Sequence, residues 1–192
     1  MSRKRNNELE VLSLYLSNYF GQFYLREISR LASLSLRTTQ ETANLLVKQK
    51  ILKSQIHGKN KYFSLNHENV AAKFLLLQAE IYKTLNFLQK HPEIKSFIKE
   101  IKGSFLVILF GSFASGSWKF NSDIDLLMAG GKKEELPLHL LPYKTHLINI
   151  PEDSFALALE KKEPLLGEIA ENHIILNNHS FYLNSRWKQN GR

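Results

Sequence analysis

The chain of 192 residues has no cysteine, only five prolines and no long hydrophobic run. Without cysteine, neither a disulfide nor a thiolate-ligated zinc ion can hold the fold together. The longest apolar run, Phe105–Phe110, is far too short to cross a bilayer. The basic residues at the start of the sequence precede an amphipathic segment instead of a continuous apolar one. We therefore expect a cytoplasmic protein with no membrane partner.

Acidic residues are scarce in the first half of the chain. The formal net charge is +8, and residues 1–103 hold 17 Lys and Arg against 8 Asp and Glu, whereas residues 104–192 hold 9 against 10. An asymmetry of this size indicates a polyanionic partner, such as nucleic acid, for the N-terminal half. The alternative is a basic surface that serves solubility alone.

The pattern of the first 50 residues predicts three helices. Apolar residues recur at helical spacing from Leu9 to Tyr19, which predicts a first helix that ends near Gly21. A short second helix follows. Ser35 is the expected N-cap of a third helix that ends near Lys50.

A basic hairpin is expected next, with strands Ile51–Ile56 and Lys61–Leu65 joined by the polar segment His57–Asn60. This order is that of a winged helix-turn-helix, and residues 24–66 resemble the DNA-binding domains of archaeal and bacterial winged-helix regulators. The resemblance implies binding of double-stranded DNA, with the third helix in the major groove and the hairpin lysines on phosphates. The alternative is a protein–protein module. The expected DNA contacts are Arg37, Thr38, Thr39, Asn44, Lys53, Lys59 and Lys61.

Residues 68–103 are predicted to form a helical connector. Val70, Phe74, Leu77, Ile81, Leu85 and Leu88 form one apolar stripe on a helix that ends at His91-Pro92. A second short helix is expected to end near Gly103. The stripe is either an ordinary packing face or the seam of a homodimer, as is common among winged-helix regulators.

Two short strands carry the residues with chemistry. The apolar run 104–110 ends at Gly111-Ser112, and after ten further residues Asp123 and Asp125 open a second strand. Side chains two apart on a strand point to the same face. Two carboxylates on one face can hold Mg²⁺, which completes its shell with water and substrate phosphates. Gly111 permits a sharp turn, and the Ser112 hydroxyl and nearby N–H groups can receive a triphosphate.

The segments Phe110–Gly116 and Asn121–Leu126 resemble the minimal version of the DNA polymerase beta-like nucleotidyltransferase superfamily. The resemblance implies a small mixed sheet with helices, Mg²⁺ as cofactor, and transfer of a nucleoside monophosphate from an NTP, with ATP as the expected nucleotide, to a hydroxyl. It implies that Asp123 and Asp125 are catalytic metal ligands. Gly111, Ser112 and Ser122 are the expected nucleotide-binding residues, with Ser122 bracing the first carboxylate.

One element of that family is missing from the sequence. Active members carry a third carboxylate on the next strand, but the strand expected at Thr145–Ile150 contains no acid and offers His146 or Asn149 instead. A neutral His or Asn binds Mg²⁺ poorly. Either Glu152 or Asp153 swings into the site, or these two acids form the first turn of the following helix.

Two histidines in the tail, His173 and His179, have no partner at ligand spacing and are interpreted as caps or surface residues. The sequence thus predicts an α+β chain: a winged helix-turn-helix in residues 1–67, a helical connector in 68–103 and a nucleotidyltransferase-like domain in 104–192. The first functional hypothesis is a Mg²⁺-dependent nucleotidyltransferase with a DNA-binding winged helix. The second is a DNA-binding regulator or antitoxin-like protein whose nucleotidyltransferase-like domain only binds nucleotide or is inactive.

Overall fold

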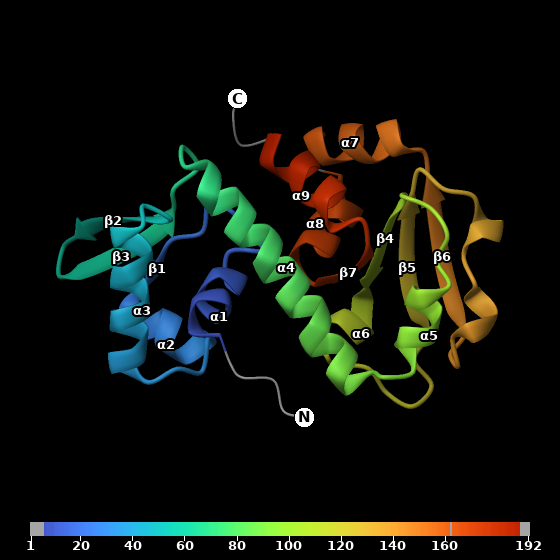
Figure 1. The fold of residues 1–192 in the computed structure, drawn as a ribbon, viewed down its shortest axis with the longest axis horizontal. Coiled ribbons are helices and arrows are strands. Elements are labelled where there is room, and N and C mark those ends of the chain that lie inside the picture. The colour runs from blue at the N-terminus through green and yellow to red at the C-terminus, as the bar shows by residue number, and fades with distance from the viewer. Residues whose placement is uncertain (1–5, 162, 189–192) are drawn as a thin grey trace. The chain divides into compact units, whose positions relative to one another are not determined.

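The computed structural model describes residues 6–161 and 163–188, and the chain divides into two compact units, Met1–Ala79 and Glu80–Arg192. The border falls inside helix α4 (Val70–Lys90), which occupies most of the predicted connector (Figure 1). The three domain boundaries expected from the sequence stay a prediction. No helix among the described residues is both long and apolar enough to span a membrane.

In its described residues, unit 1 combines three complete helices and the first part of α4 with a three-stranded antiparallel sheet in the order β1-β3-β2. Its elements are α1 (Asn7–Ser13), β1 (Phe23–Tyr24), α2 (Leu25–Leu31), α3 (Leu36–Lys48), β2 (Leu52–His57) and β3 (Asn60–Leu65). The core buries Leu12, Ile28 and Leu46. Tyr15 is also buried, and its hydroxyl donates a hydrogen bond of 3.0 Å to the Phe63 carbonyl, so the polar end of this core side chain is satisfied.

The local sequence signals of unit 1 are confirmed in part. Ser35 caps α3 as predicted, since its Oγ accepts the Thr38 N–H at 3.1 Å. The first helix is shorter than predicted: it ends at Ser13, and the following residues form tight turns. The hairpin turn is also shorter than predicted, because strand pairing continues to His57 and Asn60. Gly58 adopts φ +59° at the first position of the two-residue turn, where glycine is favoured.

Unit 2 contains a four-stranded sheet in the order β6-β5-β4-β7. Its strands are β4 (Leu106–Phe110), β5 (Ile124–Ala129), β6 (Thr145–Ile150) and β7 (His173–Asn177). Its further helices are α5 (Ile94–Lys99), α6 (Gly111–Ser115), α7 (Glu152–Glu160), α8 (Pro164–Glu171), α9 (His179–Lys188) and the 3₁₀ turns η1 (Lys133–Glu135) and η2 (Leu138–Leu140). Strand β4 is antiparallel to both of its neighbours, while β5 and β6 are parallel. The predicted mixed sheet is therefore confirmed.

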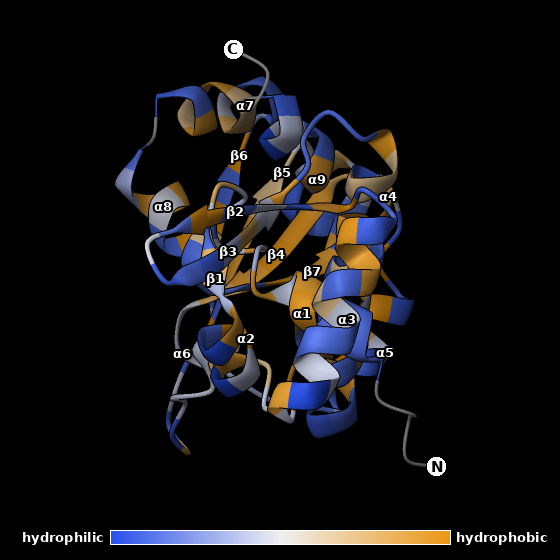
Figure 2. Cartoon of the chain, turned by 90° about the vertical axis from the view of Figure 1, so that its left-hand side faces the viewer, coloured by the Kyte–Doolittle hydropathy of each residue, from blue (hydrophilic) through white to orange (hydrophobic). Residues whose placement is uncertain are grey.

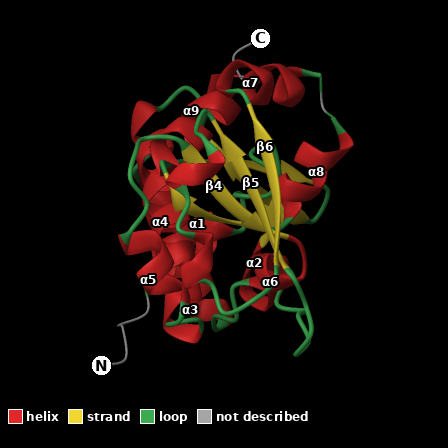
Figure 3. Cartoon of the chain, turned by 90° about the vertical axis from the view of Figure 1, so that its right-hand side faces the viewer, coloured by secondary structure: helices red, strands yellow, loops and turns green. Residues whose placement is uncertain are grey.

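Both faces of this sheet are covered by apolar side chains. Phe97 of α5 and Phe113 of α6 pack on one face. Phe155 of α7, Ile169 of α8 and Tyr182 of α9 pack on the other. The strands are accordingly the most apolar part of the unit (Figure 2), and they lie among helices (Figure 3). With both faces covered, polar chemistry is confined to the ends and edges of the strands.

Helix α4 buries a different face from the stripe seen in the sequence. Four residues of that stripe, Val70, Phe74, Ile81 and Leu85, are exposed. The buried positions include Ala72, Leu76, Ala79, Tyr82 and Phe87. Both faces are apolar, so hydrophobic spacing alone does not distinguish the buried face from the exposed one. A dimer through the exposed stripe stays a prediction.

Candidate functional site

The Gly-Ser turn and the second aspartate meet where β4 passes into α6. Phe110, the last residue of β4, pairs directly with Asp125 on β5. Gly111 follows with φ +69°, a conformation that side-chain-bearing residues rarely adopt. A Cβ at this glycine would collide with the Asp125 carboxylate. The absence of a side chain at Gly111 thus lets the turn lie against the acid.

The two aspartates face two basic side chains, one on the neighbouring strand β6 and one just before it. Asp125 lies in register with His146 of β6, and their Oδ1 and Nδ1 atoms are 3.4 Å apart. Lys144, just before β6, places its Nζ 3.4 Å from Oδ2 of Asp123. The Asp123 and Asp125 side chains are 42% and 30% exposed, whereas Ile124 between them is buried. This alternation matches two carboxylates on the same side of the strand.

The position expected for the third carboxylate is held by His146 and not by Asn149. Asn149 pairs with Met128, an odd number of residues from the His146 row, so it projects from the other face of the sheet. Its amide donates a hydrogen bond of 3.4 Å to the Gly131 carbonyl.

Glu152 and Asp153 do not replace the missing acid. The Glu152 side chain lies against Gly130, and its Oε2 atom is 3.0 Å from the position that a Cβ atom on Gly130 would take. Gly130 follows the far end of β5, about 16 Å along the strand from Asp125 at ~3.3 Å per residue. Both acids belong to the first turn of α7. The hypothesis that one of them swings into the site is therefore wrong, and the helix-terminus alternative describes their position.

The donor set suits one divalent ion better than two. The carboxylates of Asp123 and Asp125 are the hard oxygen ligands that Mg²⁺ accepts, and their partial exposure leaves room for phosphate and water oxygens. Within the described residues, no group of three His, Asp or Glu side chains could hold an ion by itself. The substrate would have to complete the shell of a bound ion, and a second ion would lack its own carboxylate.

Ser112 and Ser122 form hydrogen bonds that close turns in the segment between β4 and β5. The Ser112 carbonyl accepts the Ser117 N–H at 3.0 Å, which closes the turn after α6. Ser122 was expected to brace Asp123, but its hydroxyl instead accepts the Lys119 N–H at 2.8 Å. Its own N–H donates to the Lys119 carbonyl at 2.9 Å. Ser122 thus closes a second turn, which carries the exposed Phe120.

An aromatic cluster that the sequence did not predict packs around Phe113, the residue that follows Ser112. The Phe113 ring, next to Ser112, stacks on Trp118 at 5.3 Å and meets the Tyr143 ring edge-on at 4.9 Å. The Tyr143 hydroxyl donates to Glu93 at 2.9 Å, and the same carboxylate contacts His91 Nδ1 at 3.2 Å. The participants come from three segments, 91–93, 113–118 and 143, without shared periodicity, so no local pattern could reveal them.

The helix residues predicted to contact DNA differ in accessibility. Arg37 and Asn44 are exposed, and Arg37 forms an ion pair of 2.9 Å with Glu41 one turn on. Thr38 is partly exposed. Thr39 is fully buried, and its Oγ1 donates to the Ser35 carbonyl at 2.8 Å. The prediction that Thr39 contacts DNA is therefore wrong, because its side chain lies on the core side of α3.

The predicted hairpin lysines are all exposed to solvent. Lys59 lies in the turn, and Lys61 follows on β3 with its Nζ 5.3 Å from the centre of the Phe63 ring. Lys53 forms an ion pair of 2.9 Å with Glu68. A surface pair of this kind contributes little to stability, so Lys53 can exchange Glu68 for another anion at small cost.

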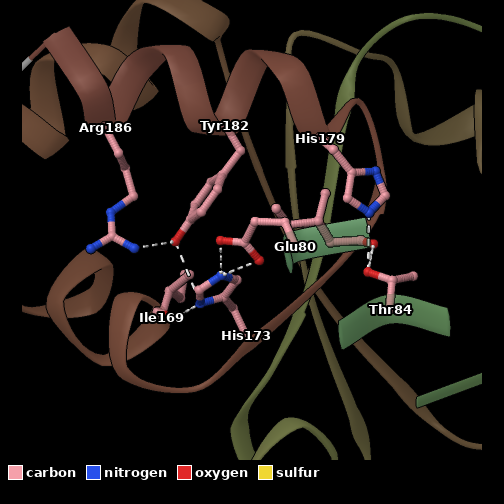
Figure 4. Close-up of polar contacts among 8 residues, drawn as sticks. Glu80, Thr84, Ile169, His173, His179, Tyr182 and Arg186 are labelled. Carbon is pink, nitrogen blue, oxygen red and sulfur yellow. Dashed lines mark hydrogen bonds and ion pairs between the residues drawn. The ribbon is translucent and has the colours of Figure 1, made fainter. Parts of the chain in front are cut away.

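The histidines interpreted as caps or surface residues belong to a buried polar network in unit 2 (Figure 4). His173 is fully buried, with Nδ1 2.9 Å from the Ile169 carbonyl and Nε2 3.1 Å from Oε1 of Glu80. Thr84 donates to the Ile175 carbonyl at 2.8 Å, and His179 Nε2 lies 3.0 Å from the same hydroxyl. The surface interpretation is wrong for His173, whose acidic partner lies 93 positions away in sequence.

The environment of this network favours an ionised Glu80. Burial by itself would raise the pKa of the Glu80 carboxyl, but the charges of His173, Lys83 and Arg186 hold that pKa below its ordinary value. Burial lowers the pKa of His173, and Glu80 opposes this. Because the Ile169 carbonyl and an ionised Glu80 both accept hydrogen bonds, both ring nitrogens of His173 must then carry a proton. The hydrogen bond between Glu80 and His173 therefore joins two buried titratable groups, and the pKa of His173 lies below its ordinary value because of burial.

Comparison with known families matches the nucleotidyltransferase domain to residues 75–177, more than half of the chain. The matched segment ends with the last residue of β7 and includes the Gly-Ser turn, both aspartates and His146. No protein of curated function and no solved structure matches the chain.

Proposed function

The chain belongs to the nucleotidyltransferase domain family, and on that premise we propose that unit 2 binds a nucleoside triphosphate with Mg²⁺ and transfers a nucleoside monophosphate to a hydroxyl acceptor. ATP is the nucleotide expected first. The observation that carries the proposal is the contact of the Gly111 turn with Asp125, which brings a phosphate-binding turn and a pair of metal-binding carboxylates to the same strand end.

Each residue of the site has a role in this proposal. Asp123 and Asp125 hold the ion, and Gly111 permits the backbone to approach the triphosphate closely. The Ser112 hydroxyl is a donor for a phosphate oxygen. Ser122 positions the Lys119–Ser122 turn beside the nucleotide through its two hydrogen bonds with Lys119. A bound Mg²⁺ supplies electrostatic stabilisation of the phosphate charge.

The position of His146 favours a second candidate function. A histidine where active members carry an acid favours a domain that binds nucleotide without transferring it, within a DNA-binding regulator or an antitoxin-like protein. The two candidates share the nucleotide site and differ in the transfer step alone. Incubation of the full chain with labelled ATP, Mg²⁺ and candidate acceptors separates them, because only the transferase labels an acceptor.

Restoring the missing acid tests both candidates. We expect His146→Asp to raise the rate of nucleotidyl transfer by about 100-fold, the order that one well-placed catalytic group contributes. The matched control is Asn149→Asp, which adds an acid to the same strand on the opposite face and should leave the rate unchanged. Transfer is measured with labelled ATP. Equal rates in the two variants would contradict the assignment of this strand position.

We further propose that unit 1 is a winged helix-turn-helix that binds double-stranded DNA. Support comes from the tight turn at 33–35 between α2 and α3, the two-residue turn of the β2–β3 hairpin, and the net positive charge of this half of the chain. Arg37 and Asn44 are placed on α3 for the major groove, with Thr38 at its margin. In this proposal the exposed side chains of Lys53, Lys59 and Lys61 bind DNA phosphates.

The hairpin lysines give this proposal a quantitative test. Replacing Lys59 and Lys61 together by glutamine should weaken binding to all DNA sequences alike and lower the slope of log affinity against log salt by about two, one for each lost phosphate contact. Replacing Lys95 and Lys99 of α5 together by glutamine is the charge-matched control and should leave the slope unchanged. Fluorescence anisotropy at several salt concentrations measures both. An unchanged slope in the double variant would remove the hairpin from the interface.

A further inference from the structure

Lys144 occupies a distinctive place at the edge of the site. Its Nζ lies 3.4 Å from Oδ2 of Asp123, and its side chain is 84% exposed. Its carbonyl accepts the Ile124 N–H at 2.8 Å, which ties its backbone to the start of β5. The backbone is therefore held in place while the ammonium group can move.

The residues next to Lys144 and Ser112 hold these two positions near each other. Tyr143 precedes Lys144, Phe113 follows Ser112, and the two rings meet at 4.9 Å. The hydrogen bond of 2.9 Å from the Tyr143 hydroxyl to Glu93 further restrains this contact. Because Lys144 contacts Asp123 and the Gly111 turn lies against Asp125, a triphosphate held between Ser112 and the two aspartates would lie close to the Lys144 ammonium group.

The charge balance of the site favours a further cation at the position of Lys144. A nucleoside triphosphate carries more negative charge than one divalent ion neutralises, and Asp123 and Asp125 add two further charges. The strand that would supply a carboxylate for a second ion supplies His146 instead. An exposed ion pair is worth about 1 kcal/mol or less, so Lys144 can leave Asp123 at small cost.

We propose that Lys144 is a phosphate-binding residue that exchanges Asp123 for a phosphate oxygen when Mg²⁺ and the nucleotide bind. In this way it supplies part of the positive charge that a second metal ion supplies in a site with three carboxylates. The inference rests on the proposed nucleotide binding at the Asp pair. It assigns the site a cation from its own chain, on the residue that precedes β6.

Two equilibrium measurements on Lys144→Gln test this role without relying on activity. Removing the cation beside Asp123 should strengthen binding of Mn²⁺ alone, measured by the loss of its free-ion electron paramagnetic resonance signal. The same variant should weaken binding of ATP with Mg²⁺ about tenfold, the order of one charge-assisted hydrogen bond, measured by calorimetry. Lys144→Arg should retain nucleotide affinity. Lys133→Gln at η1, beyond the far end of β5, is the charge-matched control.

The opposite signs of the two effects make the outcomes separable. If Lys144 only shielded Asp123, its removal would strengthen binding of both Mn²⁺ and the nucleotide, and the inference would be overturned. A structural role would weaken both, which would overturn it as well, as would two unchanged affinities. If the wild-type protein bound neither Mn²⁺ nor ATP with Mg²⁺, the proposed function itself would fail. Tighter Mn²⁺ together with weaker nucleotide binding supports the inference.

Discussion

Asp125→Asn is expected to reduce nucleotidyl transfer by at least about 100-fold, the loss typical when one group that stabilises transition-state charge is removed. The substitution keeps the shape of the side chain that lies against Gly111 and removes its charge. A neutral amide is a poor ligand for Mg²⁺, so the ion that holds the triphosphate loses half of its protein carboxylates. Transfer is measured with labelled ATP in the full-length protein.

The matched control for this experiment is Asp153→Asn. Asp153 lies in the first turn of α7, which follows the end of β6 opposite to His146. It should transfer at the wild-type rate, and thermal unfolding should show that both variants are folded. Full transfer by Asp125→Asn would remove the Asp pair from the catalytic site. Loss of transfer in Asp153→Asn as well would mean that charge at a distance, and not metal binding, governs the rate.

Glu80→Ala is expected to lower the free energy of unfolding of unit 2 by about 3–5 kcal/mol, because it leaves His173 buried without its partner. The Glu80 and His173 side chains are 1% and 0% exposed, so solvent cannot compensate for the loss. Both tryptophans of the chain, Trp118 and Trp187, belong to unit 2. Their fluorescence in a urea titration therefore reports the unfolding of this unit.

Replacing both Glu80 and His173 distinguishes the stabilisation by their mutual contact from the stabilisation by side-chain packing. Glu80→Leu combined with His173→Leu should cost less than Glu80→Ala alone, since apolar residues often replace a buried pair without loss. The two single leucine variants complete a double-mutant cycle, whose coupling measures the pair itself. Additive effects of the two single substitutions would show that Glu80 and His173 do not stabilise each other.

The network also has consequences for the geometry of the nucleotide site. His173 pairs with Phe110, which in turn pairs with Asp125, so the three residues form one row across β7, β4 and β5. Through its contact with His173, Glu80 thus connects α4 to β7, which pairs with β4, the strand that leads into the Gly111 turn. We therefore expect Glu80 variants that remain folded to lose part of their nucleotidyl transfer activity. The cause would be a displaced strand row, because Glu80 itself does not contact the nucleotide.

The sequence by itself determined the elements whose signals are local. Strand β4, the Gly111 turn, strand β5 to within one residue of its predicted start at Asp123, and the acid-free strand β6 all follow from short apolar runs and residue spacing, since strand periodicity depends on neighbouring residues alone. The N-cap at Ser35 is local in the same sense. The resemblance to the nucleotidyltransferase family then connected these local elements to metal and nucleotide binding at Asp123 and Asp125.

Only the tertiary structure decided which long-range neighbours these elements acquire. Register between β5 and β6 placed His146, and not Asn149, beside Asp125, and carried Glu152 to the far end of the sheet. The same holds for Lys144 against Asp123 and for Glu80 against His173. Such pairs are set by how separate segments pack, and an exposed and a buried apolar face look alike in sequence, as α4 shows.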